Sequence, residues 1–138
     1  MKKTKGKSIT YDEVHDNHAM VQRVEEGLPV MDVVEFGKQA GFTTDELARL
    51  IQIPARTYAR RVAGKTRLKI HEGERATRLM RVFDRAKRLF GTDENTRGWF
   101  NAKLIVLGGR TPLEYAQTEP GAREIEAVIE RIEDGVVQ

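Results

Sequence analysis

The feature that most constrains this chain is a succession of helix-start and helix-stop signals that divides it into short amphipathic segments. In the run Thr43-Thr44-Asp45-Glu46, the Thr43 hydroxyl can accept a hydrogen bond from the Glu46 amide while the Glu46 carboxylate accepts one from the Thr43 amide. Apolar residues recur after such signals with a period near 3.6, whereas no stretch alternates apolar and polar residues long enough to predict a sheet. We therefore expect an all-α fold.

Glycine, proline and capping residues locate the expected helices. The predicted segments are residues 19–27, 30–41, 44–51, 53–63 and 71–90, a short helix that carries Trp99 and Phe100, another that carries Leu113 and Tyr115, and a last helix from Ala122 to Gly135 that buries Ile125, Ile129 and Ile132. The longest helix has five arginines opposite its apolar face: Arg75, Arg78, Arg81, Arg85 and Arg88. These arginines are either a solvated face or a surface that contacts phosphates.

Charge is strongly segregated along the chain, although the net charge is only +3. Residues 49–88 carry thirteen Lys or Arg against three Asp or Glu, whereas residues 111–138 carry two against seven. A basic block of this size favours a polyanionic partner, because binding to phosphates releases condensed counterions. A solvated basic helix face would explain the same charges.

Two short helices joined by a tight turn lie inside this basic block. The second begins at Ile53-Pro54 and carries guanidinium and hydroxyl groups, as expected of the helix that enters the DNA major groove in a helix-turn-helix motif. The candidate DNA-binding residues are Arg56, Thr57, Tyr58, Arg60, Arg61, Lys65 and Arg67. Tyr58 could instead be a core residue, and a helical hairpin with a solvated arginine face is the alternative to the whole motif.

The expected organisation has three parts. Residues 1–18 are predicted to form a flexible basic arm, residues 19–90 a helix-turn-helix domain with a long connecting helix, and residues 91–138 a small helical C-terminal domain. The lysines of the arm could add phosphate contacts, or could simply favour solubility.

Several classes of protein are disfavoured by the composition. The chain has no cysteine, and its three histidines lack the spacing of a metal site, so we expect neither a metal nor another cofactor. No nucleophile, base and orienting group can be assembled, and no phosphate-binding glycine motif is present, so we expect no catalytic residues and no enzyme. No apolar run is long enough to span a membrane or act as a signal peptide, which favours a cytoplasmic protein.

The motifs of both halves resemble the Xre/MbcA/ParS family of antitoxins, the partners of RES-domain toxins in bacterial type II toxin–antitoxin pairs. In the N-terminal half the resemblance rests on Gly27-Leu28-Pro29 and on the run from Ile53 to Arg61. In the C-terminal half the matching motifs are Gly91, Trp99, Leu107 to Leu113, Thr118 to Ala122, Arg131-Ile132 and Gly135-Val136. The family usually has a Pro-Asn turn between Trp99 and Gly108, whereas this chain has Asn101 to Val106 there.

The resemblance implies an Xre-like helix-turn-helix bundle followed by a small helical toxin-binding domain. It implies an antitoxin that neutralises an NAD-consuming RES-domain toxin by covering its active site, and that binds operator DNA to autoregulate its operon. The residues that it implies in toxin binding are Trp99, Gly108, Gly109, Arg110, Thr111, Pro112, Glu119, Arg131, Gly135, Val136 and Val137. The end of the chain, from Ile132 to Gln138, is the part expected to occlude the toxin.

Two other hypotheses stay open at this point. The chain could be a stand-alone helix-turn-helix transcriptional regulator whose C-terminal half only dimerises it, or an interaction module whose arginines are merely solvated. A homodimer is expected if the chain binds DNA, because helix-turn-helix proteins commonly read palindromic sites as two-fold dimers.

Overall fold

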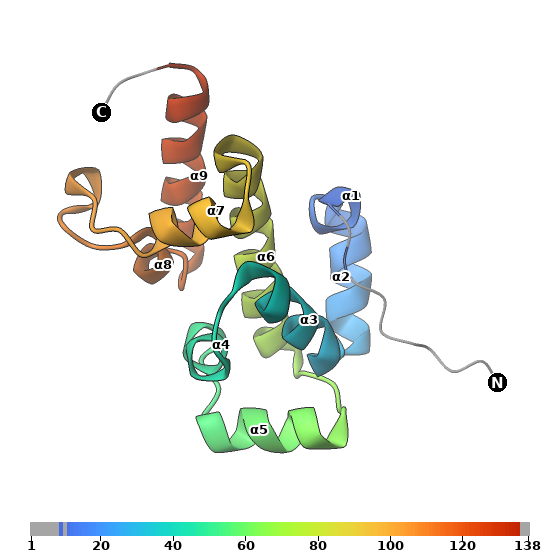
Figure 1. Cartoon of the computed structure of the whole chain (residues 1–138). Helices are drawn as coiled ribbons and strands as arrows, with labels where there is room; N and C mark the ends of the chain where they lie inside the picture. The colour runs from blue at the N-terminus through green and yellow to red at the C-terminus, as the bar shows by residue number, and fades with distance from the viewer. Residues whose placement is uncertain (1–8, 10, 136–138) are drawn as a thin grey trace. The chain divides into compact units, whose positions relative to one another are not determined.

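The structure is a computed structural model that describes residue 9 and residues 11–135, and the fold is all-α within that part (Figure 1). Its elements are α1 (Tyr11–Val14), α2 (Asn17–Glu26), α3 (Val30–Ala40), α4 (Thr44–Ile51), α5 (Ala55–Gly64), α6 (Ile70–Phe90), α7 (Asp93–Phe100), the 3-10 helix η1 (Ile105–Leu107), α8 (Pro112–Tyr115) and α9 (Glu119–Glu133). No β-strand occurs among the described residues, which contain only two isolated bridges. No helix in them is long and apolar enough to cross a membrane.

The chain divides into two compact units, and the division falls inside α6, between Thr77 and Arg78. The sequence instead predicts a boundary after residue 90, at the glycine that ends the helix. The two parts of α6 have different packing partners. Gly73 lies close to Val24 in unit 1, whereas Phe83 stacks on Phe100 in unit 2, with ring centroids 5.5 Å apart. The end of a helix therefore does not mark the end of a packing unit in this chain.

Part of the expected flexible arm is folded. Residues 11–18 contain α1 and the start of α2, where the Asp16 carboxylate accepts a hydrogen bond from the Ala19 amide at 3.1 Å. Arg23 of α2 bonds to both Glu13, at 3.0 Å, and the buried Asp32 of α3, at 3.1 Å. Burial raises the pKa of Asp32, an effect that Arg23 partly offsets. The lysines of the predicted arm, at positions 2, 3, 5 and 7, lie outside the described residues.

The helices α3, α4 and α5 follow the sequence signals closely. Gly41 ends α3 with a φ of 84°, and Thr43 and Glu46 form both hydrogen bonds of the expected capping box at the start of α4. Gly37 of α3 lies so close to Leu47 of α4 that a Cβ at this position would collide with the leucine side chain. Backbone bonds from Val30 to Thr66 (3.0 Å) and from Leu68 to Leu28 (2.8 Å) then tie the segment after α5 to the segment before α3.

In unit 2, arginines of α6 pair with acids along α9. Arg81 bonds Glu126 at 2.9 Å and Arg85 bonds Glu133 at 3.1 Å, while Arg78 donates to the Gln117 carbonyl at 3.0 Å. Within unit 1, Arg75 donates to the Ile51 carbonyl at 3.2 Å. The arginines opposite the apolar face therefore have partners inside the protein, which argues against both a purely solvated face and a phosphate-binding surface.

The last helix buries Ala122, Ile125, Val128 and Ile129. Ile132, which its spacing predicts to be in this set, is only partly buried. The helix also starts earlier than the predicted Ala122, because Thr118 caps a helix that begins at Glu119. Pro120 and Gly121 are therefore part of the first turn, where proline is tolerated because its missing amide has no helical partner.

We predict that Gly121→Ala destabilises the protein, because a Cβ at Gly121 would collide with the backbone carbonyl of Tyr115. The expected loss is about 1–3 kcal/mol in the free energy of unfolding, measured by urea denaturation. Gly98→Ala is the matched control, since Gly98 lies within α7 and has no neighbour within 4 Å of an added Cβ. The control should gain about 0.4–1 kcal/mol. Equal stabilities for the two variants would contradict this packing.

Candidate functional site

The first candidate site is the pair α4 and α5, which lie at a steep angle to each other (Figure 1). The turn between them is Gln52-Ile53-Pro54. Gln52 ends α4 in the left-handed region, with a φ of 63°, and Ile53 is buried while its amide bonds to the Ala48 carbonyl at 2.9 Å. Pro54 then precedes the first residue of α5. This geometry is that of a helix-turn-helix, in which α5 occupies the place of the recognition helix.

One face of α5 is open to solvent and consists of two arginines between alanines: Ala55, Arg56, Ala59, Arg60 and Ala63. Arg56 and Arg60 are four residues apart, so their side chains lie on the same side of the helix. No hydrogen bond or ion pair within the described part of the chain involves either guanidinium, and the same is true of Lys65, which follows the helix with a φ of 53°. Small side chains around two free guanidiniums allow the helix backbone to approach a groove closely.

Three of the predicted DNA-binding residues are engaged inside the protein. Tyr58 is 1% exposed and belongs to the core, which corrects its assignment as a DNA contact. Arg61 donates to the buried carboxylate of Glu72 in α6. Arg67 donates to the Gly27 carbonyl at 2.6 Å. Thr57 is partly buried on α5. The motif therefore has fewer free cations than the sequence suggested, because Arg61 and Arg67 are bonded within the protein.

Glu72 connects two elements through one carboxylate. It accepts from Arg61 of α5 and, at 2.8 Å, from the Lys69 amide just before α6. Burial alone would raise the pKa of Glu72, but the hydrogen bonds from Arg61 and Lys69 and the charge of Arg61 together hold this pKa below its ordinary value of 4.5. The ionised form of Glu72 therefore stabilises the fold.

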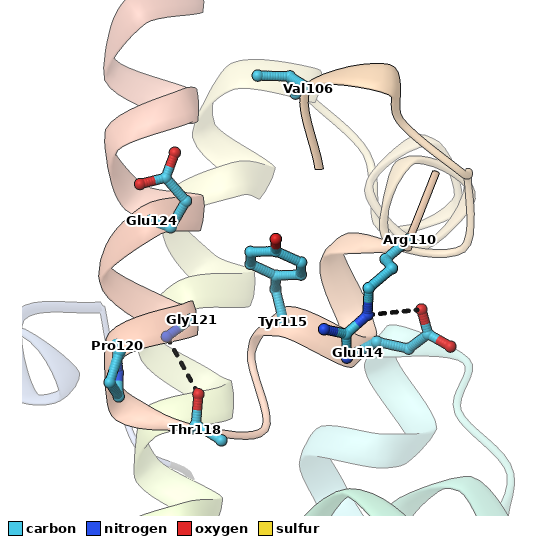
Figure 2. A pocket seen from close by; sticks show the side chains of 8 residues that line it. All are labelled: Val106, Arg110, Glu114, Tyr115, Thr118, Pro120, Gly121 and Glu124. Atoms are coloured by element: carbon cyan, nitrogen blue, oxygen red, sulfur yellow. Dashed lines mark hydrogen bonds and ion pairs between the residues drawn. The ribbon is translucent and has the colours of Figure 1, made fainter. Parts of the chain in front are cut away.

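The second candidate site is a pocket of about 480 Å³ in unit 2, shown in Figure 2. Residues of α8, α9 and the turns before them line it: Val106, Arg110, Glu114, Tyr115, Thr118, Pro120, Gly121 and Glu124. The Arg110 guanidinium lies 5.0 Å from the centre of the Tyr115 ring and 3.8 Å from the Glu114 carboxylate. Apolar walls with both signs of charge at the rim suit a side chain or small group from a partner.

The structure places the predicted toxin-binding residues in several different roles. Arg110 lines the pocket, while Gly108 and Gly109 form an exposed turn with φ values of 68° and 84°. Thr111 forms a capping box with Glu114, and Pro112 is buried, so these two residues shape α8.

The remaining candidates lie elsewhere. Trp99 is partly buried against Phe90, with ring centroids 5.1 Å apart. Glu119 faces Arg78 and Arg81 at 3.8 and 3.7 Å, and Arg131 pairs with Glu124 at 3.5 Å. Gly135 is exposed, and Val136 and Val137 lie outside the described residues.

Comparison with known proteins assigns both units to known families. Residues 19–81 match the family described as an Antitoxin Xre-like helix-turn-helix domain, and residues 85–135 match the Antitoxin Xre/MbcA/ParS C-terminal toxin-binding domain. Antitoxin Xre from Photorhabdus laumondii is 35% identical over 115 residues, which are 83% of this chain and 78% of that protein. Antitoxin Xre from Yersinia enterocolitica is 33% identical over 118 residues, which are 85% of this chain and 80% of that protein.

The chain belongs to the Xre family of antitoxins. In this antitoxin, the helix-turn-helix match covers α4 and α5, and the toxin-binding match covers the pocket and α9. The predicted fold class and family are thereby confirmed. Among residues 9 and 11–135, no cluster of three or more His, Asp or Glu could hold a metal ion.

Sequence reasoning missed several residues of the pocket. The sequence indicates Tyr115 only as a helix residue and Pro120 and Gly121 only as part of a family motif before the last helix, and it assigns no binding role to Val106 or Glu124. The sequence signal that could have located the pocket is Pro120-Gly121, because a glycine inside a first helical turn indicates close approach of another segment. Gly121 lies against the backbone of Tyr115, which brings α8 next to α9.

We predict that Glu72→Gln lowers the free energy of unfolding by about 2 kcal/mol at pH 7, because Arg61 loses its charged partner. The folded-state pKa of Glu72 is depressed, so this contribution is present above pH 4.5 and is lost as the pH falls through the lowered pKa. Urea denaturation of both proteins between pH 7 and pH 3 measures the difference. Glu74→Gln, at an exposed position of α6, is the control and should stay close to the wild type. A difference that persists undiminished at pH 3 would refute the role of this ion pair.

Proposed function

We propose that this antitoxin neutralises an NAD-consuming RES-domain toxin by covering its active site, and that it binds operator DNA to repress its own operon. The observation that carries the proposal is the presence, in one chain, of an open arginine face on α5 and a toxin-binding domain. The role is binding rather than catalysis, and it is exercised in the cytoplasm, where the operator lies.

The DNA-binding half of the proposal rests on the geometry of α5. Arg56, near the start of the helix, and Arg60, one turn later, extend from a face otherwise made of alanine. Guanidiniums read guanine edges in the major groove, and alanine methyls can contact thymine methyls. Lys65, just after the helix, is placed for a phosphate. Thr57, at the edge of this face, is also proposed to contact the DNA. A two-fold homodimer would present two copies of α5 to a palindromic operator.

The toxin-binding half rests on the family match and on charge. Residues 111–138 carry two basic residues against seven acids, and Glu130 and Asp134 of this segment are exposed. An acidic surface is complementary to a cleft that binds an anionic dinucleotide. Arg110 and the glycine turn beside it complete the proposed contact surface. The end of the chain, including Val136 and Val137, remains the segment proposed to enter the cleft.

We predict that Arg56→Ala and Arg60→Ala each weaken binding to the operator about 5- to 150-fold and relax its sequence preference. Lys65→Ala should weaken binding to all DNA sequences equally, and it should reduce the slope of the salt dependence of binding by about one charge. Mobility shifts with the chain's own promoter and a scrambled duplex, at two salt concentrations, measure these effects.

Arg61→Ala and Arg123→Ala are informative controls for the DNA experiment. Arg61→Ala should lower stability through Glu72, whereas Arg123→Ala, exposed on α9, should bind like the wild type. Undiminished operator binding by the Arg56→Ala/Arg60→Ala double variant would exclude the proposed face.

Co-expression tests the toxin-binding half. Cells that express the neighbouring RES-domain toxin alone should lose NAD and stop growing. Cells that also express this antitoxin should keep their NAD and continue to grow. The double variant Arg56→Ala/Arg60→Ala should protect as well as the wild type when expressed from a foreign promoter, because those residues serve DNA alone. A fall in NAD that the wild-type chain does not prevent would overturn the neutralising role.

A further inference from the structure

The most exposed large apolar side chain in the described part of the antitoxin belongs to η1. Ile105 is 96% exposed, and its neighbour Val106 is 39% exposed. The other large apolar side chains with high exposure in that part, Val21 and Ile70, belong to unit 1. A single exposed isoleucine is common on protein surfaces, but Ile105 and Val106 are adjacent and Val106 borders a pocket, and such a contiguous apolar surface favours a partner that covers it.

Backbone hydrogen bonds hold this turn in one conformation. The Leu104 amide donates to the Arg110 carbonyl at 3.0 Å, and the Gly109 amide donates back to the Leu104 carbonyl at 2.9 Å. Gly108 and Gly109 supply the left-handed conformations that reverse the chain, and Leu107 is buried. Ile105 is therefore presented by a closed turn, and a side chain that is already positioned loses less entropy on binding.

The turn lies beside the pocket of unit 2. Val106 forms one wall of that pocket, opposite Pro120 and Gly121, with Tyr115 between them (Figure 2). A projecting isoleucine and a recess of about 480 Å³ thus adjoin each other. Interfaces bind most strongly where an apolar centre is surrounded by a polar rim, and here Arg110, Glu114 and Glu124 supply that rim.

We propose that Ile105 and Val106 are the principal apolar contact through which the antitoxin binds its toxin, with the adjoining pocket receiving a side chain of the toxin. This proposal rests on the proposed function and names the part of the toxin-binding domain that carries affinity. The toxin surface that fits is an apolar recess bordered by a carboxylate, because the exposed cations Lys103 and Arg110 lie at the two ends of the turn.

Charge disfavours a second copy of this chain as the occupant. A two-fold interface brings the same patch of both copies together. Centred on Ile105, it would place the Lys103 and Arg110 pairs of the two copies near one another, and such repulsion suppresses the contact. A toxin has no such constraint, and the matched toxin-binding domain, residues 85–135, contains the whole turn.

The test compares Ile105→Asp with Val21→Asp, which introduces the same charge at an exposed apolar position of α2. Both full-length variants are titrated against the purified RES-domain toxin by calorimetry, and their masses are measured by light scattering. We expect Ile105→Asp to weaken toxin binding about 30-fold or more, which is the range of a central interface residue. Val21→Asp should bind like the wild type, Ile105→Leu should retain most of the affinity, and all masses should be equal.

The outcomes distinguish failure of the proposed antitoxin function from failure of the proposed apolar contact. If wild type and Ile105→Asp bind the toxin equally, the antitoxin function stands and the apolar contact is wrong. If the wild type itself does not bind the toxin, the proposed function fails and this inference fails with it. If Ile105→Asp has a lower mass than the wild type, the turn is a contact between copies of this chain, which also overturns the proposal.

Discussion

The carboxylate of Glu72 is the contact on which the DNA-binding unit depends. It holds the Arg61 guanidinium of α5 and the amide of Lys69 at the start of α6, so one buried acid fixes the recognition helix to the helix that follows it. This contact also divides the arginines of α5 by role. Arg61 is used inside the protein, and Arg56 and Arg60 are left on the open face. Packing thus decides which arginines of α5 stay available to a partner.

Charge pairing has a similar effect in the C-terminal unit. Arg81 and Arg85 of α6 pair with Glu126 and Glu133 of α9, so part of the basic block and part of the acidic end of the chain neutralise each other within this unit. The charges that stay available to partners are those without internal roles, such as Glu130 and Asp134. Counting charges along the sequence therefore overstates the surface charge of both the basic block and the acidic end of the chain.

Much of the fold was predictable because its signals are local. The capping box at Thr43 and Glu46 and the left-handed Gly41 depend on residues within one helical turn, and each lies where the sequence places it. The site was less predictable because it depends on contacts between distant residues. Nothing near Arg61 indicates that Glu72 will bind it, and nothing in the segment 101–106 indicates that Ile105 will be exposed.

The central claim is that DNA and toxin are bound by different, predefined surfaces of this antitoxin. It is tested most directly by an NMR titration of the isotope-labelled chain, first with the operator duplex and then with the RES-domain toxin. We expect the duplex to shift amide signals of residues 55–65, and the toxin to shift those of residues 104–124 and to leave the signals of α5 unchanged. Duplex-induced shifts centred on the paired arginines of α6, or toxin-induced shifts centred on α5, would contradict it.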